Sequence, residues 1–370
     1  MQKLPLVSIL VRTCGRPKVL KECLESIKNQ TYPNIEVCVV EDGAPLSEAL
    51  LSGEFSGMSI KYKALGEKKG RSVAGNEALA LASGEYLNFL DDDDLFYEKH
   101  VEIMVQTALT MPEQSIFYAK ADEAVTDIQS TNPYVYETIS VTQRPFLHYS
   151  KENLLVHNIF PIQTVFFKRE VYEAHGGFRT DLEYLEDWEL WLKYAGRYEF
   201  VAVEETTSLY RVPANRDAVA HREALLKQNE AEIRQSYVRK LLDLTEPSPV
   251  PDAMQNRTVR YAIDSMSKQG SFFIAYGWCC MKNVPSETAS VFVLLTMPDE
   301  TKRILPAFRY DRPDIETKYN DLKYRKSGFF VCDVLNQAEY CKAEILVCHD
   351  GKFYRNRQGK LWQKLFGFNK

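Results

Sequence analysis

Long apolar runs alternate with helix-forming segments over the first hundred residues, and this alternation constrains the fold more than any other feature. Residues 6–13 (LVSILVRT), 35–43 and 85–90 are continuous apolar runs, typical of strands that are buried on both faces. Pro17 opens a helix with one apolar face, and residues 70–85 predict a second helix rich in small residues. This order of elements predicts a parallel sheet with right-handed crossovers.

Polar side chains fall where the predicted strands end. Thr13 and Asp42 end the first two strands, and the third runs into four consecutive aspartates at residues 91–94. Open α/β sheets bind ligands at the carboxyl ends of their strands. Four adjacent carboxylates repel one another, so they mark a solvated turn, a helix start or a site for a divalent cation such as Mg²⁺ or Mn²⁺. The shared edge favours the cation site. Two pairings stay open: Asp91 with Asp93, or Asp92 with Asp94.

The 370-residue chain is long enough for two or three domains. A proline-rich polar stretch, DLTEPSPVPDAMQN, predicts a boundary between them. We expect a catalytic α/β domain at 1–215, a long charged helix and linker at 216–256, and an antiparallel β-sandwich at 257–370, where short apolar strands alternate with polar turns. Residues 126–145 (TDIQSTNPYVYETISVTQRP) read as a long irregular loop, which we expect to face the substrate.

The net charge, the cysteines and the hydropathy of the chain limit the classes of function that we expect. A formal net charge of −5 gives no electrostatic basis for binding nucleic acid. The eight cysteines lack zinc-type spacing and predict reduced structural thiols. No apolar stretch has bilayer length, and the opening MQKLPLVSILVRT leads directly into a strand pattern. We therefore expect a cytoplasmic protein.

The final residues, 360–370 (KLWQKLFGFNK), interleave aromatic side chains with lysines. Such a segment can lie on an anionic membrane surface, as a peripheral contact at the inner face of the cell membrane. It can equally dock onto the sandwich. Both interpretations remain open on the sequence.

Residues 5 to about 212 resemble the inverting GT-A glycosyltransferases of family 2, specifically the bacterial surface-polysaccharide type. Four segments carry the resemblance in the family's order: VSILVRTCGRP, SIKNQTYPNIEVCVVEDGA, GRSVAGNEALALASGEYLNFLDDDD and GGFRTDLEYLEDWELWLK. The resemblance implies a nucleotide-sugar-binding, Rossmann-like mixed sheet with helices on both faces. The pieces AYGWC, YDRPDI and SGFF resemble accessory sandwich domains that are appended to related transferases.

The resemblance also implies roles for seven residues. Thr13, Asp42 and Arg71 would contact the nucleotide, Asp91 or Asp92 would face the ribose or donor sugar, Asp93 would bind the metal, and Asp187 would be the catalytic base. A carboxylate at a helix N-terminus stays ionised, because the helix dipole favours the anion. It could therefore accept the proton of an attacking hydroxyl.

The implied reaction is transfer of a hexosyl or deoxyhexosyl group from a nucleotide-diphosphate sugar, with UDP or dTDP as the nucleotide, to a glycan or lipid-linked oligosaccharide. Mn²⁺ or Mg²⁺ would assist it. Arg12 and Gly15 stand where the family usually has proline and asparagine, which leaves base recognition open. Two other functions are considered: a haloacid-dehalogenase-like phosphatase, and a non-catalytic sugar-binding protein on a transferase fold. The oligomeric state is open.

Overall fold

The computed structural model describes residues 4–131, 134–182, 184–214, 252–269, 272–296, 300–334 and 342–356, together with Ile233, Ser236, Tyr237 and Leu241. Most of the predicted long helix and all of the aromatic tail lie outside these residues. The chain groups into two compact units, Met1–Tyr149 with Asn158–Ile233 and Ser150–His157 with Arg234–Lys370. The domain limits at residues 215 and 257 stay a prediction.

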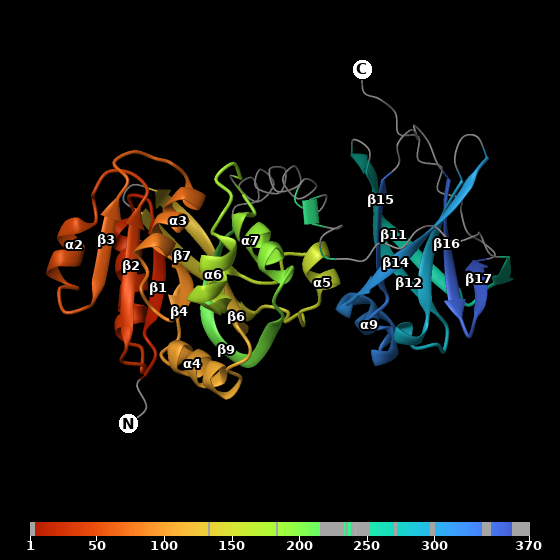
Figure 1. Ribbon diagram of the computed structural model, residues 1–370, viewed down its shortest axis with the longest axis horizontal. Helices are drawn as coiled ribbons and strands as arrows, with labels where there is room; N and C mark the ends of the chain where they lie inside the picture. The colour runs from red at the N-terminus through yellow and green to blue at the C-terminus, as the bar shows by residue number, and fades with distance from the viewer. Residues whose placement is uncertain are drawn as a thin grey trace, which may run out of the picture. The chain divides into compact units, whose positions relative to one another are not determined.

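The first unit is built on a mixed sheet with the strand order β3-β2-β1-β4-β8-β6-β9-β5, and β7 pairs with β6 (Figure 1). Its strands are β1 (Val7–Thr13), β2 (Ile35–Glu41), β3 (Ile60–Ala64), β4 (Tyr86–Asp91), β5 (Leu95–Phe96), β6 (Ile116–Thr131), β7 (Tyr134–Gln143), β8 (Val165–Lys168) and β9 (Phe200–Pro213). The three predicted strands, β1, β2 and β4, are parallel as expected, and β3, which was not predicted, is parallel to β2. Strand β8 is antiparallel to both β4 and β6.

Helices cover both faces of this sheet. They are α1 (Pro17–Lys28), α2 (Glu48–Gly53), α3 (Arg71–Leu81), α4 (His100–Thr110), α6 (Arg169–His175) and α7 (Glu186–Ala195), with a short η1 (Ile162–Thr164). Successive side chains of β8 point to opposite faces. Phe166 joins the core formed with α1, α2 and α4, whereas Phe167 contacts Trp191 of α7. The α/β class predicted from the sequence is therefore confirmed.

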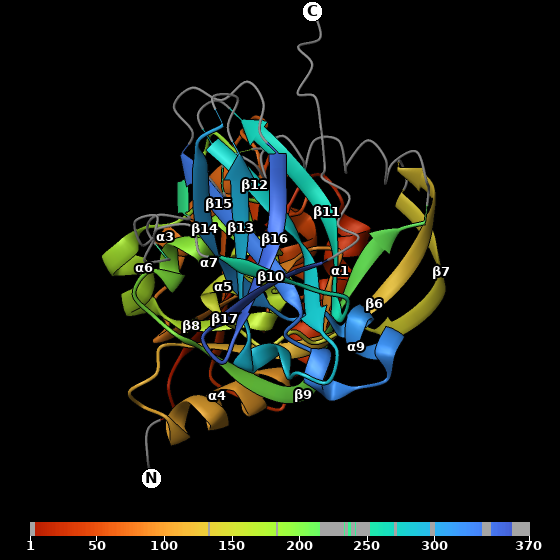
Figure 2. The ribbon, with the colours of Figure 1, turned by 90° about the vertical axis from the view of Figure 1, so that its right-hand side faces the viewer.

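The substrate-facing loop predicted at residues 126–145 is wrong. Most of that segment belongs to β6 and β7, which run side by side as a long antiparallel ribbon (Figure 2). The pairing register shifts between Val125 and Thr126 and again between Ile128 and Ser130. These two irregularities break the alternation of apolar and polar residues, so the sequence did not look like a strand.

The second unit is a β structure with the strand order β10-β17-β16-β13-β14-β15-β12-β11. Its elements are α5 (Lys151–Val156), β10 (Ala253–Asn256), β11 (Val259–Gln269), β12 (Phe272–Met281), η2 (Ser286–Thr288), β13 (Ser290–Thr296), β14 (Lys302–Tyr310), α9 (Pro313–Tyr319), η3 (Leu322–Tyr324), β15 (Gly328–Val334), β16 (Lys342–His349) and β17 (Lys352–Asn356). All pairs are antiparallel except β10 with β17.

Strand β14 joins the two halves of this second unit. It pairs with β13 over residues 302–307 and with β15 over residues 308–310. Val259 of β11, Val293 of β13 and Phe329 of β15 share one apolar core. The predicted second β structure is thus present, and its two halves enclose a common core.

Helix α5 belongs to the second unit although strands of the first unit precede and follow it in the sequence. The side-chain carbonyl of Asn153 accepts a hydrogen bond from the backbone N–H of Asp311, at 3.0 Å. Leu154 and Leu155 are fully buried. No helix among the described residues is long and apolar enough to cross a membrane.

Candidate active site

The carboxyl ends of β1, β2 and β4 meet at one edge of the first sheet. Arg12 lies opposite Asp91 in the β1–β4 register. One residue further, the N–H of Asp92 donates to the Arg12 carbonyl at 3.2 Å, and the N–H of Asp42 donates to the Thr13 carbonyl at 2.8 Å. The parallel ladder therefore places the aspartate run beside Thr13 and Asp42.

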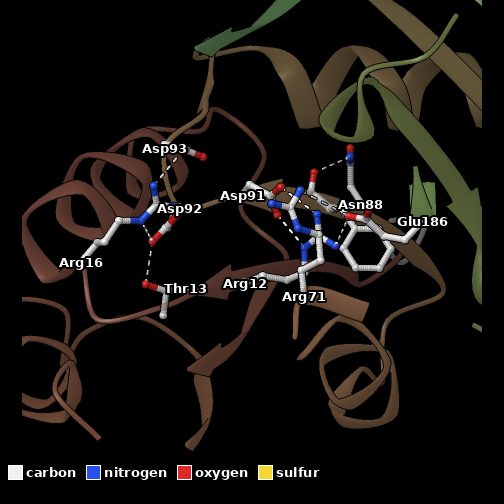
Figure 3. Close-up of polar contacts among 10 residues, drawn as sticks. Arg12, Thr13, Arg16, Arg71, Asn88, Asp91, Asp92, Asp93 and Glu186 are labelled. Carbon is white, nitrogen blue, oxygen red and sulfur yellow. Dashed lines mark hydrogen bonds and ion pairs between the residues drawn. The ribbon is translucent and has the colours of Figure 1, made fainter. Parts of the chain in front are cut away.

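Asp91 is held by Arg12 through two hydrogen bonds. Nε and Nη2 of Arg12 donate to the two carboxylate oxygens of Asp91, each at 2.7 Å (Figure 3). Burial opposes ionisation of Asp91, but the arginine outweighs it and lowers the pKa of the carboxyl. Burial also opposes the charge on Arg12, yet Asp91 and Glu186 raise its pKa overall. The pair is therefore a buried ion pair with bidentate geometry.

Glu186 is the second partner of Arg12. Its Oε1 accepts from Nη1 of Arg12 at 3.0 Å and lies 3.8 Å from Nη1 of Arg71, whose side chain is half exposed. Burial raises the pKa of Glu186; Arg12 opposes this effect and the adjacent Asp187 adds to it. Two arginines and two carboxylates thus form a charge-balanced cluster around Asp91.

Asp92 and Asp93 share Arg16, which follows β1. Thr13 Oγ1 donates to Asp92 at 2.7 Å, Arg16 pairs with Asp92, and Nη1 of Arg16 donates to Asp93 at 3.0 Å (Figure 3). Burial raises the pKa of Asp92 to about 7; Arg16 opposes the shift and Asp93 contributes to it. The side chain of Asp93 is 32% exposed, against 1% for Asp92. Asp93 is therefore the more accessible of the two to a ligand.

Asp94 anchors β9 to the end of the run. It accepts the backbone N–H of Arg211 at 3.0 Å, and burial together with the neighbouring aspartates raises its pKa well above the ordinary value. The Arg211 guanidinium donates to the carbonyl of Asp93 and to Glu22, and lies 4.7 Å from the centre of the Tyr136 ring. Asp94 is thus buried and engaged in a structural contact.

Asp42 holds the loop that leads into α3. Its two carboxylate oxygens accept the backbone N–H groups of Lys69 and Gly70, at 2.6 and 3.1 Å. Gly70 has a φ of 94°, a conformation that glycine adopts without strain. Arg71 follows as the first residue of α3, so the contacts of Asp42 also hold the backbone just before this helix begins.

Asp187 lies half-buried in the first turn of α7. Its Oδ2 accepts from the side-chain amide of Asn158 at 3.0 Å, and its Oδ1 accepts the Trp188 N–H at 2.8 Å. Trp188 itself is buried in the core. The structure therefore gives Asp187 an orienting partner and partial access to solvent, and its catalytic role remains a prediction.

Five residues of this edge were not predicted as site residues: Arg12, Arg16, Glu186, Asn158 and Arg211. Arg16 lies within the motif VSILVRTCGRP, and Glu186 directly precedes the predicted base, so both had a local signal. Asn158 and Arg211 had none, because their partners lie far away in the sequence.

Comparison with known proteins shows which family the first unit is similar to. Residues 8–173 match the model described as Glycosyl transferase family 2. The chain is 28% identical over 190 residues to EpsH of Bacillus subtilis, a protein named as a glycosyltransferase, covering 50% of this chain and 54% of EpsH. It is 33% identical over 103 residues to the glycosyltransferase GlyG of Streptococcus pneumoniae, covering 27% of this chain and 34% of GlyG. The chain spans little more than half the length of the first curated relatives it matches.

Two solved structures are similar at a lower level. TarS of S. aureus is 11% identical with a TM-score of 0.46, covering 95% of this chain and 77% of TarS. The mannosyltransferase PcManGT from Pyrobaculum calidifontis, in complex with GDP-Man and Mn²⁺, is 20% identical with a TM-score of 0.44. The match covers 65% of this chain and 74% of PcManGT. The family assignment rests on the family model and the curated relatives. Residues 8–173, which lie within the first unit apart from α5, match glycosyl transferase family 2, the family that the sequence motifs resemble.

Proposed function

We propose that this chain is an inverting glycosyltransferase that moves a sugar from a nucleotide-diphosphate donor, with UDP or dTDP as the nucleotide, to a hydroxyl of a glycan or lipid-linked glycan. The donor would bind at the edge where β1, β2 and β4 end. The second unit would serve the acceptor or assembly. The acceptor class, and with it a role in surface polysaccharide synthesis at the inner face of the cell membrane, follows from the resemblance alone.

One observation carries the proposal: the connection between Asp187 and the aspartate run. Asp187 directly follows Glu186, Glu186 pairs with Arg12, and Arg12 holds Asp91. A half-buried carboxylate with an orienting amide is therefore fixed relative to a cluster of acids and arginines. A general base and a diphosphate site need such a fixed relation.

Asp93 is the proposed ligand for Mn²⁺ or Mg²⁺. Among the described residues, no group of three or more His, Cys, Asp or Glu side chains could hold a metal ion by itself. Mg²⁺ commonly takes only one or two carboxylates and completes its shell with substrate phosphates and water. The partly exposed Asp93 can supply one such carboxylate. A bound metal would neutralise charge on the departing diphosphate.

The protein's own residues then account for the displacement. Asp187 takes the proton of the acceptor hydroxyl, and the acceptor oxygen forms a bond to the anomeric carbon. The bond from that carbon to the diphosphate breaks, the electron pair leaves with the nucleoside diphosphate, and the configuration inverts. Asn158 holds Asp187 for this transfer. Arg71, half exposed at the start of α3, would contact the base or the diphosphate.

The phosphatase alternative fits the site less well. Its nucleophile would be the first aspartate of the run, but both oxygens of Asp91 are engaged by Arg12. The run also follows β4 and not the first strand of the sheet.

Thermal stabilisation by nucleotides tests the proposal. UDP, dTDP, GDP and CDP are compared, each with Mn²⁺ and with EDTA, on the parent chain and on Asp93→Ala. A ligand that binds only the native state raises its stability, by about 2.7 kcal/mol at a hundred times its Kd. We expect one nucleotide to raise the melting temperature only with metal and only when Asp93 is present. The absence of any shift would refute the donor site, and phosphatase and glycan-binding assays would then decide between the alternatives.

A further inference from the structure

A single side chain connects the two parts of the proposed reaction centre. The guanidinium of Arg12 contacts Asp91, the first member of the aspartate run, and Glu186 in the first turn of α7. Glu186 directly precedes Asp187. Arg12 thus lies between the donor side and the turn that carries the proposed base, as Figure 3 shows for its carboxylate partners.

The surroundings of Arg12 are shaped for an arginine. Its side chain is only 7% exposed, and its guanidinium carbon lies 5.9 Å from the Phe89 ring centre and 5.5 Å from that of Phe178. Gly75 of α3 leaves the necessary space: a Cβ there would come within 2.5 Å of the Phe178 ring and 3.4 Å of Arg12 Cδ. A charge buried to this degree is tolerated only when its donors are satisfied, and two carboxylates and two rings meet that condition here.

The first turn of α7 is held by the buried Trp188, by the contact of Asn158 with Asp187, and by the ion pairs of Glu186. The residue before it, Leu185, has a φ of 63° and gives no side-chain cap to the helix. No side-chain cap therefore holds this helix end, and the carboxylate of Glu186 is held by its ion pairs. Of its two cationic partners, Arg12 is buried and 3.0 Å away, whereas Arg71 is half exposed and 3.8 Å away. Arg12 is the stronger restraint.

We propose that Arg12 is a positioning residue, which sets the distance between the aspartate run and Asp187 by holding Asp91 and Glu186 with one guanidinium. The inference rests on the proposed function and adds to it a residue that the family resemblance does not supply. Loss of the Arg12–Glu186 contact displaces Asp187 but leaves Asp93 in place. A displacement of about 1 Å in a reacting group can reduce the rate by about 100-fold. The effect therefore falls on kcat and not on donor binding.

Four variants of the full chain separate these effects: Glu186→Ala, Glu186→Gln, Arg12→Met, and Arg12→Met with Glu186→Ala. The probe is UDP-N-acetylglucosamine, or the donor that the nucleotide panel selects, and the readouts are kcat and KM for release of the nucleoside diphosphate. Calorimetry with the free nucleoside diphosphate gives its Kd. Glu36→Gln is the control, because it removes the charge of a buried carboxylate near the start of β2, at the end of the strand opposite to the site.

We expect Glu186→Ala to lower kcat by about 10- to 100-fold while KM and Kd change less than about threefold. Glu186→Gln keeps an oxygen for Arg12, so it restores most of the rate. If Arg12 acts through Glu186, the kcat of the double variant is no lower than that of Arg12→Met alone, because both substitutions remove the same Arg12–Glu186 contact. Glu36→Gln leaves kcat unchanged.

Two results overturn the inference while the proposed function stands. One is an unchanged kcat in Glu186→Ala, and the other is a fold-decrease in the kcat of the double variant that equals the product of the decreases in the two single variants. Either would mean that Arg12 only neutralises buried carboxylates. A parent chain that binds no nucleotide and releases none from any donor overturns the proposed function itself, and this inference with it. A folding defect in Arg12→Met would appear as a lost circular dichroism signal, and the two Glu186 variants, which retain Arg12 and Asp91, then decide the matter alone.

Discussion

Glu36 provides a test of how charge stabilises the first unit. It lies near the start of β2, is 4% exposed, and accepts hydrogen bonds from Ser8 Oγ at 2.5 Å and from Ser83 N and Oγ at 2.6 and 2.8 Å. Lys61 Nζ lies 2.9 Å away. Burial opposes ionisation of Glu36, but these donors outweigh it and lower its pKa from 4.5 to about 2. The carboxylate therefore ties β1, β2 and the turn before β4 together.

The contribution of the Glu36 charge to the free energy of unfolding follows from that pKa. A shift of about 2.5 units at 1.36 kcal/mol per unit corresponds to about 3 kcal/mol of stability at pH 7. Because the folded-state pKa is depressed, this contribution is fully present above about pH 4.5 and is lost as the pH falls through about 2. We expect Glu36→Gln to lower the free energy of unfolding by about 3 kcal/mol at pH 7. At pH 3 the decrease should be smaller by about 2 kcal/mol, because the parent chain has itself lost that much of the contribution.

Urea unfolding of the full chain, followed by tryptophan fluorescence at pH 7 and pH 3, measures both values. An unchanged m value is required before the two curves are compared. The exposed Glu25 on α1 supplies a matched control, because Glu25→Gln is expected to stay within about 0.5 kcal/mol of the parent. A loss of equal size at both pH values would refute the reasoning, since it would show that the charge of Glu36 is not the stabilising feature.

Three further predictions concern single residues. Asp187→Asn should lower kcat by about 100- to 10,000-fold with the nucleotide-induced thermal shift retained, and a normal rate would exclude Asp187 as the base. In the second unit, Nη2 of Arg309 donates to the Cys279 carbonyl, but its Nε and Nη1 are buried without a partner among the described residues, and burial lowers its pKa. Arg309→Met should therefore raise the free energy of unfolding by about 1–3 kcal/mol in urea titrations, whereas a loss would show that the guanidinium is satisfied. A Cβ on Gly277 would lie 2.1 Å from the Ala262 carbonyl on the paired strand, so Gly277→Ala should destabilise by about 1–3 kcal/mol, and an unchanged midpoint would contradict this packing.

The shared edge of the candidate site was predictable because its causes are local. Continuous apolar runs identify buried strands, and parallel strands end at the same edge. Thr13, Asp42 and the aspartate run therefore had to be neighbours once β1, β2 and β4 were recognised. The helix carrying Asp187 was equally visible, since the apolar side chains of α7 recur at helical spacing.

The pairing within the site was not predictable, because it depends on contacts between distant segments. Arg12 and Glu186 are 174 residues apart, and nothing near either residue indicates the other. Arg12 showed in the sequence only as a departure from the family's proline. The β6–β7 ribbon was missed for a different reason, since its register shifts disrupt the alternation that identifies strands.

The path of the chain limits how the two units can be separated. It passes between them three times, after Tyr149, after His157 and after Ile233. A fragment cut in the proline-rich stretch would keep α5 but lose β14, the strand that α5 contacts. Asn158, which holds Asp187, is the first residue after that excursion. An exchange of accessory units between relatives would therefore succeed only if residues 150–157 were inherited together with the β strands of the second unit.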